Sequence, residues 1–245
     1  KIKSNFFEVH IQKTNNLVSE INNLKADLVI NDILDTNSDY IKQLKKTNLK
    51  VINFEDLGDG ALHADLVFNA IYPEKKIYKN HFYGQKYYCA RYEFIESKTK
   101  KINKNVKNIL ITFGGVDPNN LTLKILDSIY DFCNNNNIQI NVVTGPGYQK
   151  NETLDKYKNN ITLKNNISNI SKFMLDADIA FISSGRTTFE IACIGTPAIV
   201  IAQNKRETTH FFASKKYGFL NLGLCHEVSN TFILNNFIDL VNNYD

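Results

Sequence analysis

The 245-residue sequence predicts an α/β fold made of two Rossmann-like domains, each a doubly wound parallel sheet. Three observations lead to this prediction. Short, continuous apolar segments are typical of buried strands, helical patterns alternate with them, and the same rhythm occurs in both halves of the chain. Between the halves, residues 96–105 are charged and lose the apolar periodicity, which is typical of a linker. We therefore predict an N-terminal domain over residues 1–100 and a C-terminal domain over residues 101–245.

The first half contains three predicted strands, over residues 27–32, 50–54 and 65–69, and two predicted helices, over residues 17–24 and 39–45. The chain has no initiator Met, and its first clear strand begins only near Asp27. We therefore expect the first domain to be truncated at its N-terminus. A fused N-terminal domain in a longer protein is compatible with this expectation.

The second half predicts a full doubly wound domain. The predicted strands cover residues 108–113, 138–144, 161–163, 178–183 and 197–202. The predicted helices cover residues 121–129, 170–175, 188–194, 207–217 and 232–244.

Composition excludes several classes of protein. A hydrophobic content of 43% and a charged content of 22% are ordinary for a soluble globular protein. No apolar run approaches the roughly 18 residues of a membrane span. The net charge of +4 is mild and the lysines are dispersed, so we expect no nucleic-acid partner. The four cysteines lie far apart without CxxC or CxxH spacing, which predicts a reducing, cytoplasmic location and no zinc site. We expect no other metal and no cofactor.

The segment from Ser183 to Glu190 carries the most chemical information. It follows an apolar strand and precedes an apolar helix, so its small polar turn would present backbone N–H groups and a helix N-terminus to a phosphate. Glu190, in the first helical turn, could accept hydrogen bonds from a sugar hydroxyl, and Arg186 could neutralise phosphate charge. The alternative is helix capping, with Ser184 or Thr187 as the cap and Glu190 as its acidic partner.

A second turn, Gly114-Gly115, also lies between a strand and a helix. Glycines there let the backbone approach a ligand, although a plain turn is the alternative, with Asp117 capping the helix and Pro118 at its first position. Both turns follow parallel strands at the edge where open α/β sheets bind ligands, so together they predict a diphosphate or ribose site. A third loop at this edge contains Asn204, a candidate sugar or base contact.

Catalytic residues are less clear. His63 is the only histidine that we place near the strand ends of the first half, and a lone histidine is a weak candidate for a general base. Polar residues end the neighbouring strands and could orient a sugar or cap the following segments: Asp32, Glu55, Asp56 and Asn69.

Several motifs match those of one family. Residues 113–122 resemble a G-G-x-D-P-x-N-L-T loop, residues 185–190 a G-x-T-x-aromatic-E turn, and residues 195–197 a G-x-P motif. In the first half, Asp32, residues 55–57, residues 63–66 and Asn69 give a softer match. From about Asp27 to about Gly223, the sequence resembles the nucleotide-sugar hydrolases of pseudaminic acid biosynthesis and the related spore-coat polysaccharide proteins. These proteins have the GT-B fold and are distant relatives of the lipid II-forming N-acetylglucosaminyltransferase.

The resemblance implies that water attacks the anomeric carbon of a UDP-linked acetamido-deoxy sugar and that UDP leaves. It implies UDP binding by the C-terminal domain, with Glu190 on the ribose and Gly114, Gly115 and Thr187 near the diphosphate. The other predicted contacts with the UDP-sugar are Ser184, Gly185, Arg186, Thr188 and Asn204.

Two departures from the family pattern matter. The family's G-x-G-H loop, whose histidine is thought to be the general base, has no match in this chain, so we expect the chain by itself to be inactive. Lys205 replaces the glutamine that follows Asn204 in the family. The alternatives are a non-catalytic nucleotide-sugar-binding module of a bifunctional sialic-acid-type enzyme and a GT-B glycosyltransferase. A G-x-G-H loop upstream of Lys1 would favour hydrolysis, and a cytidylyltransferase domain there would favour the bifunctional enzyme.

Overall fold

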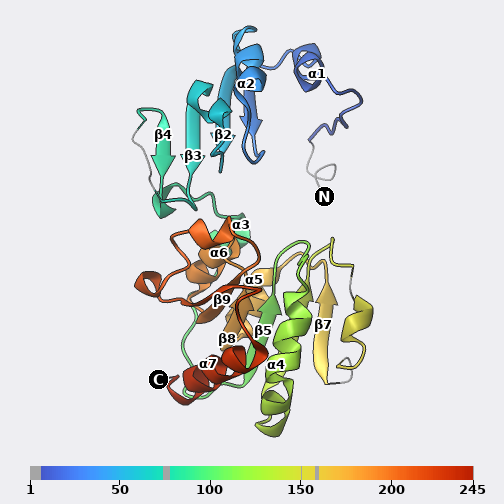
Figure 1. The fold of residues 1–245 in the computed structure, drawn as a ribbon, viewed down its shortest axis with the longest axis vertical. Coiled ribbons are helices and arrows are strands. Elements are labelled where there is room, and N and C mark those ends of the chain that lie inside the picture. Colours follow the sequence, from blue (N-terminus) through green and yellow to red (C-terminus); the bar gives the residue numbers. More distant parts are fainter. Residues whose placement is uncertain (1–6, 74–77, 150, 158–159, 245) are drawn as a thin grey trace. The chain divides into compact units, whose positions relative to one another are not determined.

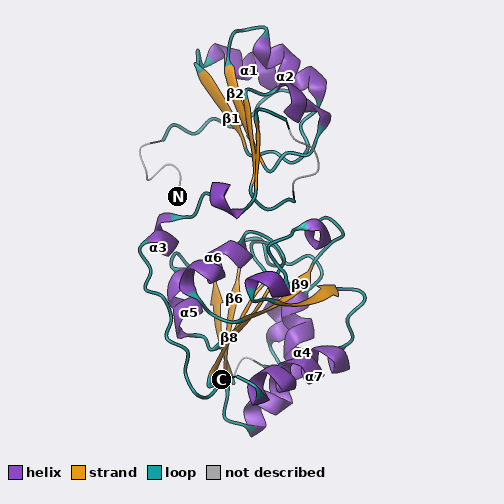
Figure 2. Ribbon diagram, turned by 90° about the vertical axis from the view of Figure 1, so that its left-hand side faces the viewer, coloured by secondary structure: helices purple, strands orange, loops and turns teal. Residues whose placement is uncertain are grey.

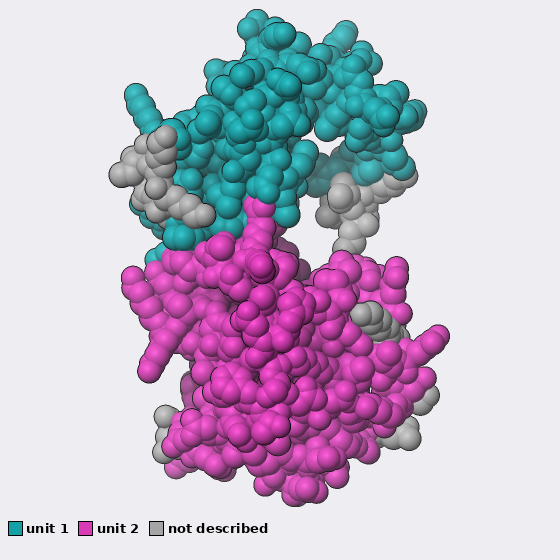
Figure 3. Space-filling model, viewed as in Figure 1, with its two compact units in different colours: residues 1–87 teal, residues 88–245 magenta. Residues whose placement is uncertain are grey.

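The computed structural model describes residues 7–73, 78–149, 151–157 and 160–244. The chain forms two compact units, residues 1–87 and residues 88–245 (Figure 3). Residues 88–100 therefore belong to the second unit by their packing: the backbone N–H of Lys100 donates to the Ile194 carbonyl at 2.7 Å, and Lys100 Nζ donates to the Leu175 carbonyl at 3.0 Å. The division into functional domains 1–100 and 101–245 stays a prediction.

Unit 1 contains a four-stranded parallel sheet in the order β1-β2-β3-β4 (Figures 1 and 2). The strands are β1 (Leu28–Asn31), β2 (Lys50–Phe54), β3 (Leu66–Asn69) and β4 (His81–Tyr83). The helices are α1 (Leu17–Asn23), α2 (Ser38–Lys45) and the 3₁₀ helices Asp59–His63 and Gln85–Tyr87. Apolar side chains of α2 and of the strands form the core, among them Ile41, Leu44, Val51 and Val67.

Strand β4 was not predicted, because three residues carry too short a pattern to stand out in a sequence. Its place is explained by a ladder of aromatic rings across three strands. Phe54 stacks on Phe68 with a centroid separation of 5.4 Å, and Phe68 stacks on Phe82 at 5.2 Å. Cross-strand aromatic pairs of this kind stabilise a sheet.

Unit 2 contains a six-stranded parallel sheet in the order β10-β9-β8-β5-β6-β7. The strands are β5 (Asn108–Thr112), β6 (Gln139–Thr144), β7 (Ile161–Asn165), β8 (Ile179–Ile182), β9 (Ala198–Ala202) and β10 (Leu220–Leu224). The helices are α3 (Tyr92–Ile95), α4 (Leu121–Asn135), α5 (Ile170–Asp176), α6 (Thr187–Ile194) and α7 (Asn230–Asn242), with 3₁₀ helices at Asn151–Leu154, Glu207–Thr209 and Lys215–Tyr217.

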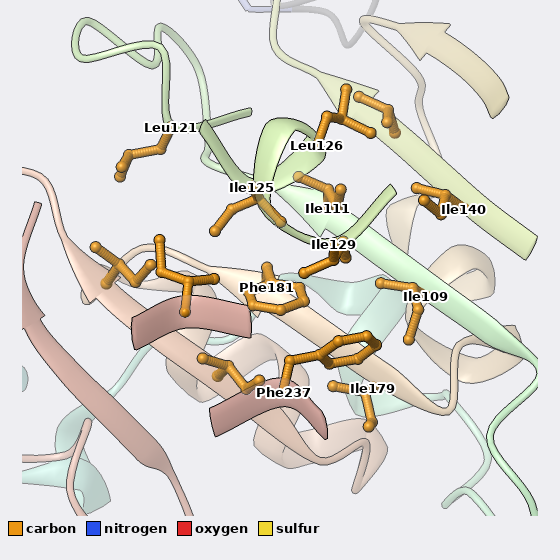
Figure 4. Packing of buried hydrophobic residues seen from close by; sticks show 14 of the residues in the cluster. Ile109, Ile111, Leu121, Ile125, Leu126, Ile129, Ile140, Ile179, Phe181 and Phe237 are labelled. Atoms are coloured by element: carbon orange, nitrogen blue, oxygen red, sulfur yellow. The ribbon is translucent and has the colours of Figure 1, made fainter. Parts of the chain in front are cut away.

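Alternate residues of the central strands face two apolar clusters, one on each side of the sheet. Ile109 and Phe181 pack with α4 and α7 on one face, where Phe237 of α7 contributes a ring (Figure 4). Leu110 and Ala180 pack with α5 and α6 on the other face. Burial on both faces explains why these strands have continuous apolar sequences. No helix within the described ranges is long and apolar enough to cross a membrane.

The helix predicted over residues 207–217 is wrong. This segment holds two short 3₁₀ helices, and β10, which was not predicted, follows it. Tertiary contacts override the helical pattern here: Phe212 stacks on Phe189 of α6 at 4.2 Å, and Gly218 takes a φ of +83° that ends the second 3₁₀ helix. In β10 a register shift between Asn221 and Leu224 obscures the strand pattern.

A buried charge cluster holds residues 100–108 against the rest of unit 2. The Asp178 carboxylate is fully buried and accepts hydrogen bonds from Asn103 Nδ2 at 2.6 Å and from the backbone N–H groups of Lys107 and Asn108 at 2.8 and 2.9 Å. Lys100 Nζ, whose side chain is 5% exposed, lies 3.6 Å from the same carboxylate. A buried carboxylate with this many donors stabilises the fold only as long as every member is present.

We expect Asp178→Ala to lower the free energy of unfolding by about 3–5 kcal/mol, because it leaves the buried Lys100 ammonium without its counter-charge and the backbone N–H groups of Lys107 and Asn108 without their carboxylate acceptor. Urea unfolding followed by circular dichroism measures the loss. Asp176→Ala, which removes an exposed carboxylate two residues away, is the matched control. Equal stability of the two variants would contradict this account of Asp178.

Candidate functional site

The strand order of unit 2 identifies one edge of the sheet as the place for a ligand. From β5 the chain proceeds to β6 and β7 on one side, and then returns to β8, β9 and β10 on the other. Open α/β sheets bind ligands outside the carboxyl ends of the strands at such a reversal. Because β5 and β8 pair with Thr112 opposite Ile182, the two predicted turns leave neighbouring strands at the same level.

A pocket of about 280 Å³ lies at this edge. Five of the nine predicted ligand contacts line it: Gly114, Gly115, Arg186, Thr187 and Glu190. The other lining residues come from the start of unit 2, from the strand ends and turns after β5, β6 and β7, and from α5: Arg91, Thr112, Val143, Thr144, Gly145, Pro146, Asn166, Ile167 and Ile170.

Glycines shape the floor of this pocket. Gly114 has a φ of +77°, in the left-handed region that favours glycine. A Cβ on Gly115 would meet no atom within 4 Å, so its backbone is open to a ligand. A Cβ on Gly145 would lie 2.4 Å from both the Gly114 oxygen and the Gly115 Cα, so the turn after β6 rests directly on the turn after β5. Gly147 N–H donates to the Gly115 carbonyl at 2.9 Å and fixes the same contact.

Gly145 was missed as a functional residue. In the sequence, Gly145-Pro146-Gly147 indicates only the end of a predicted strand. The signal that could have identified Gly145 is a second glycine turn after the strand next to β5.

Asp117 caps α4, as the alternative interpretation of this turn expected, but it lies four residues before the first residue of the helix, Leu121. Its buried carboxylate accepts from the backbone N–H groups of Leu121 and Thr122 at 2.8 and 2.9 Å. The helix begins at Leu121, so Pro118 does not occupy its first position. Asn120 takes a φ of +52°, which turns the chain into the helix.

The capping interpretation of the second turn is wrong, since neither Ser184 nor Thr187 caps α6. Arg186 is the N-cap residue and its side chain makes no capping hydrogen bond. Ser184 and Thr188 are buried beneath the turn; Thr188 Oγ1 donates to the Gly185 carbonyl at 2.8 Å. Uncapped helix N-termini attract anions, because their N–H groups and the helix dipole favour negative charge.

The remaining predicted contacts lie outside the lining of the pocket. They are Ser184, Gly185, Thr188 and Asn204. Asn204 is exposed, and its Oδ1 accepts from Glu207 N–H at 3.0 Å, so it caps the 3₁₀ helix Glu207–Thr209. Contact of these four residues with a ligand stays a prediction.

Glu190 lies in a largely buried wall of the pocket with its side chain 12% exposed. Its Oε1 accepts from Arg91 Nε at 3.0 Å and from Arg91 Nη2 at 2.9 Å. Burial raises the pKa of the Glu190 carboxyl, and the charge and hydrogen bonds of Arg91 act in the opposite direction. Behind this pair, the Tyr88 ring stacks on Phe189 at 4.4 Å. Arg91 was missed, because a single arginine in an aromatic stretch has no distinguishing pattern.

His63, the weak candidate for a general base, stays a prediction. His63 ends the 3₁₀ helix Asp59–His63 and is partly exposed. A pocket of about 380 Å³ in this unit is lined by His81 of β4, and His63 is not part of its lining. Burial lowers the pKa of His81, while the charge of Asp56 raises it.

The predicted polar strand ends of unit 1 have a structural role. The Asp56 carboxylate is buried and accepts from Thr36 N–H at 2.9 Å, Thr36 Oγ1 at 2.6 Å, Asn53 Nδ2 at 2.6 Å and Gly58 N–H at 2.9 Å. Asn69 Oδ1 accepts from the Asp56 N–H at 2.9 Å. These residues join the loops after β1, β2 and β3. Their contact with a sugar stays a prediction.

Two known proteins are similar to this chain in sequence. The sequence is 35% identical over 226 residues to an uncharacterized protein of Methanocaldococcus jannaschii, covering 84% of this chain and 46% of that protein. It is 26% identical over 210 residues to the spore coat polysaccharide biosynthesis protein SpsG of Bacillus subtilis, covering 81% of this chain and 62% of that protein. The chain thus spans about half of one relative and three fifths of the other. No family model matches the sequence.

Solved structures share the fold. MurG of Acinetobacter baumannii superimposes with a TM-score of 0.60 at 15% identity, over 99% of this chain and 79% of MurG. The UDP-GlcNAc 2-epimerase of M. jannaschii, solved with UDP-GlcNAc and UDP, gives a TM-score of 0.57 at 15% identity, over 92% of this chain and 73% of the epimerase. The predicted fold class, an α/β protein with two parallel sheets of the GT-B-like Rossmann type, is confirmed.

We expect Gly145→Ala to destabilise the protein by about 1–3 kcal/mol, the usual cost of forcing extra atoms into a packed site, because the new methyl group meets backbone atoms of Gly114 and Gly115. Thermal unfolding measures this effect. Gly115→Ala is the matched control, since its methyl group meets no neighbour. An unchanged melting temperature for Gly145→Ala would show that the two turns are not in contact.

Proposed function

We propose that the pocket of unit 2 binds the UDP part of a UDP-sugar and that the protein is a nucleotide-sugar enzyme of surface polysaccharide biosynthesis. One observation carries the proposal: two glycine turns, the N-terminus of α6 and a largely buried glutamate meet in one pocket at the reversal of strand order. The relative named for spore coat polysaccharide biosynthesis and the UDP-bound epimerase of similar fold support it.

Each part of the pocket has a role in this proposal. The diphosphate lies over the Gly114–Gly115 turn and the N-terminus of α6, where backbone N–H groups and the helix dipole stabilise its charge. Arg186 adds positive charge at the same place. Glu190 accepts hydrogen bonds from the ribose hydroxyls. These groups stabilise UDP as a leaving group when its bond to the anomeric carbon breaks.

The favoured reaction is hydrolysis of an acetamido-deoxy UDP-sugar, in which water attacks the anomeric carbon and UDP departs with the bonding electrons. The motifs around Gly114 and Glu190 support this reaction. A glycosyltransferase is the alternative, supported by the likeness in fold to MurG. We assign no catalytic base, and His63 keeps only its position as a weak candidate. Because the chain by itself has no match to the G-x-G-H loop and is expected to be inactive, the turnover test needs a protein that also carries such a loop. Incubation of that protein with a UDP-acetamido sugar separates the alternatives: a hydrolase releases UDP and free sugar, and a transferase releases UDP only with an acceptor. A pure binding module releases neither.

We expect Glu190→Gln to weaken UDP binding by about 1–3 kcal/mol, because a charged acceptor for a hydroxyl group is replaced by a neutral one. Isothermal titration calorimetry on the whole chain measures the change. Glu227→Gln, at an exposed position, is the matched control and should bind like the original protein. Binding that is insensitive to Glu190→Gln would remove Glu190 from the site, and failure of the original protein to bind any nucleotide would overturn the proposed function.

Gly115→Ala separates binding from folding. The melting temperature should stay within about 1–2 °C of the original value, because the new Cβ meets no protein atom and φ of Gly115 is not positive. UDP affinity should fall by about tenfold or more, because the methyl group occupies the space where the diphosphate approaches the backbone. Unchanged affinity would mean that the ligand does not approach this turn.

A further inference from the structure

Arg91 is the charged residue of the pocket lining to which the proposed function gives no role. Three of its nitrogens are engaged by carboxylates: Nε and Nη2 converge on Glu190 Oε1 at 3.0 and 2.9 Å, and Nη1 lies 2.8 Å from Glu93 Oε1. The guanidinium carbon lies 4.9 Å from the centroid of the Phe94 ring, and that ring is buried. Arg91 is therefore held in one orientation although its side chain is 54% exposed.

The anchoring of Arg91 extends to a third helix. Glu93 Oε2 accepts from the backbone N–H of Ser171, the second residue of α5, at 3.2 Å. The contacts thus run from α5 through Glu93 and Arg91 to Glu190 on α6. Side chains fixed in this way position the groups that they hold more accurately than free side chains do.

The contact leaves one oxygen of Glu190 for a ligand. Both Arg91 donors go to Oε1, and among the residues that the structure describes no donor is bound to Oε2. Four other titratable or charged groups face this carboxylate: Glu93 on α3, Arg186 and Cys193 at the two ends of α6, and Tyr88 before α3. Arg91 alone among these five groups donates a hydrogen bond to it within the described part of the chain.

We propose that Arg91 is a positioning residue, which holds Glu190 as an oriented acceptor for the sugar hydroxyl groups of the nucleotide. This inference rests on the proposed function. A site built to bind a hydroxyl discriminates against a ligand that lacks it, because the buried acceptor is then left without a partner. Arg91 thereby sets the preference of the pocket for a ribonucleotide over a 2′-deoxyribonucleotide.

Removal of Arg91 has a defined effect on Glu190. Burial already raises the pKa of this carboxyl, Glu93 raises it further, and Arg91 is the first cause that lowers it. Without Arg91 the pKa rises, so the acceptor form is present at high pH and is lost as the pH falls through the raised value. Nucleotide affinity should then fall with decreasing pH.

The test is calorimetric titration of the whole chain with UDP and with 2′-deoxy-UDP, from about pH 8 down to about pH 5.5, a range above the ordinary pKa of glutamate. The original protein should prefer UDP by about tenfold, and its own pH profile, to which the terminal phosphate of UDP contributes, is the reference for the variants. In Arg91→Met, which keeps the length of the side chain over Phe94, the preference should fall to about twofold or less, and UDP affinity should fall by a further ten times or so towards the acidic end.

Two further variants make the result specific. Arg91→Lys restores the charge without the paired N–H groups, so the pH profile should recover while the ribose preference stays reduced. Lys172→Met removes an exposed cation of α5 outside the pocket and should change neither readout.

Two results for Arg91→Met would overturn the inference. In the first, the variant keeps the UDP affinity, the ribose preference and the pH profile of the original protein. In the second, the variant loses UDP affinity while the ribose preference and the pH profile stay unchanged, which would indicate direct contact of Arg91 with phosphate. If the original protein binds UDP and Glu190→Gln weakens binding, either result leaves the proposed function standing. If the original protein binds no nucleotide, both the function and the inference fall.

Discussion

The pairing of β5 with β8 is the constraint on which unit 2 depends. These strands are adjacent because the chain adds β6 and β7 on one side of β5 before it returns to the other side. Helices cover both faces of the sheet here, so the residues of β5 and β8 are apolar on both faces. The same pairing brings two turns, separated by about 70 residues in sequence, to neighbouring positions. The pocket is thus a consequence of sheet topology, and the turn after each strand supplies the chemistry.

Charge is distributed differently in the two units. In unit 1 the buried Asp56 carboxylate takes four donors and holds loops together. In unit 2 Asp178 has the same structural role far from the pocket, whereas Glu190 keeps one oxygen outside the network that fixes it. A carboxylate that is held through one oxygen has a fixed orientation and can still accept a hydrogen bond from a ligand at its other oxygen. A carboxylate with donors on both oxygens has less capacity to do so.

The central strands and most helices could be predicted from sequence because their apolar patterns record local burial. Strands β4 and β10 could not, since the first is three residues long and the second contains a register shift. Gly114, Gly115 and Glu190 could be predicted because they follow strands that are visible in the sequence. Arg91 and Gly145 could not, because their roles depend on contacts between segments, with Glu190 in one case and with the turn after β5 in the other.

The stacking of Tyr88 on Phe189 has an optical consequence. The chain contains no tryptophan, so its near-ultraviolet emission comes from 12 tyrosines. Tyr88 is half-buried, its hydroxyl lies 3.5 Å from the Arg186 carbonyl, and the charge of Glu190 acts on it. Glu190 lines the pocket and Tyr88 does not, so a molecule bound to Glu190 would alter the field around this ring through the carboxylate. Tyrosine emission is therefore an intrinsic, label-free reporter of events at the carboxyl edge of the larger sheet.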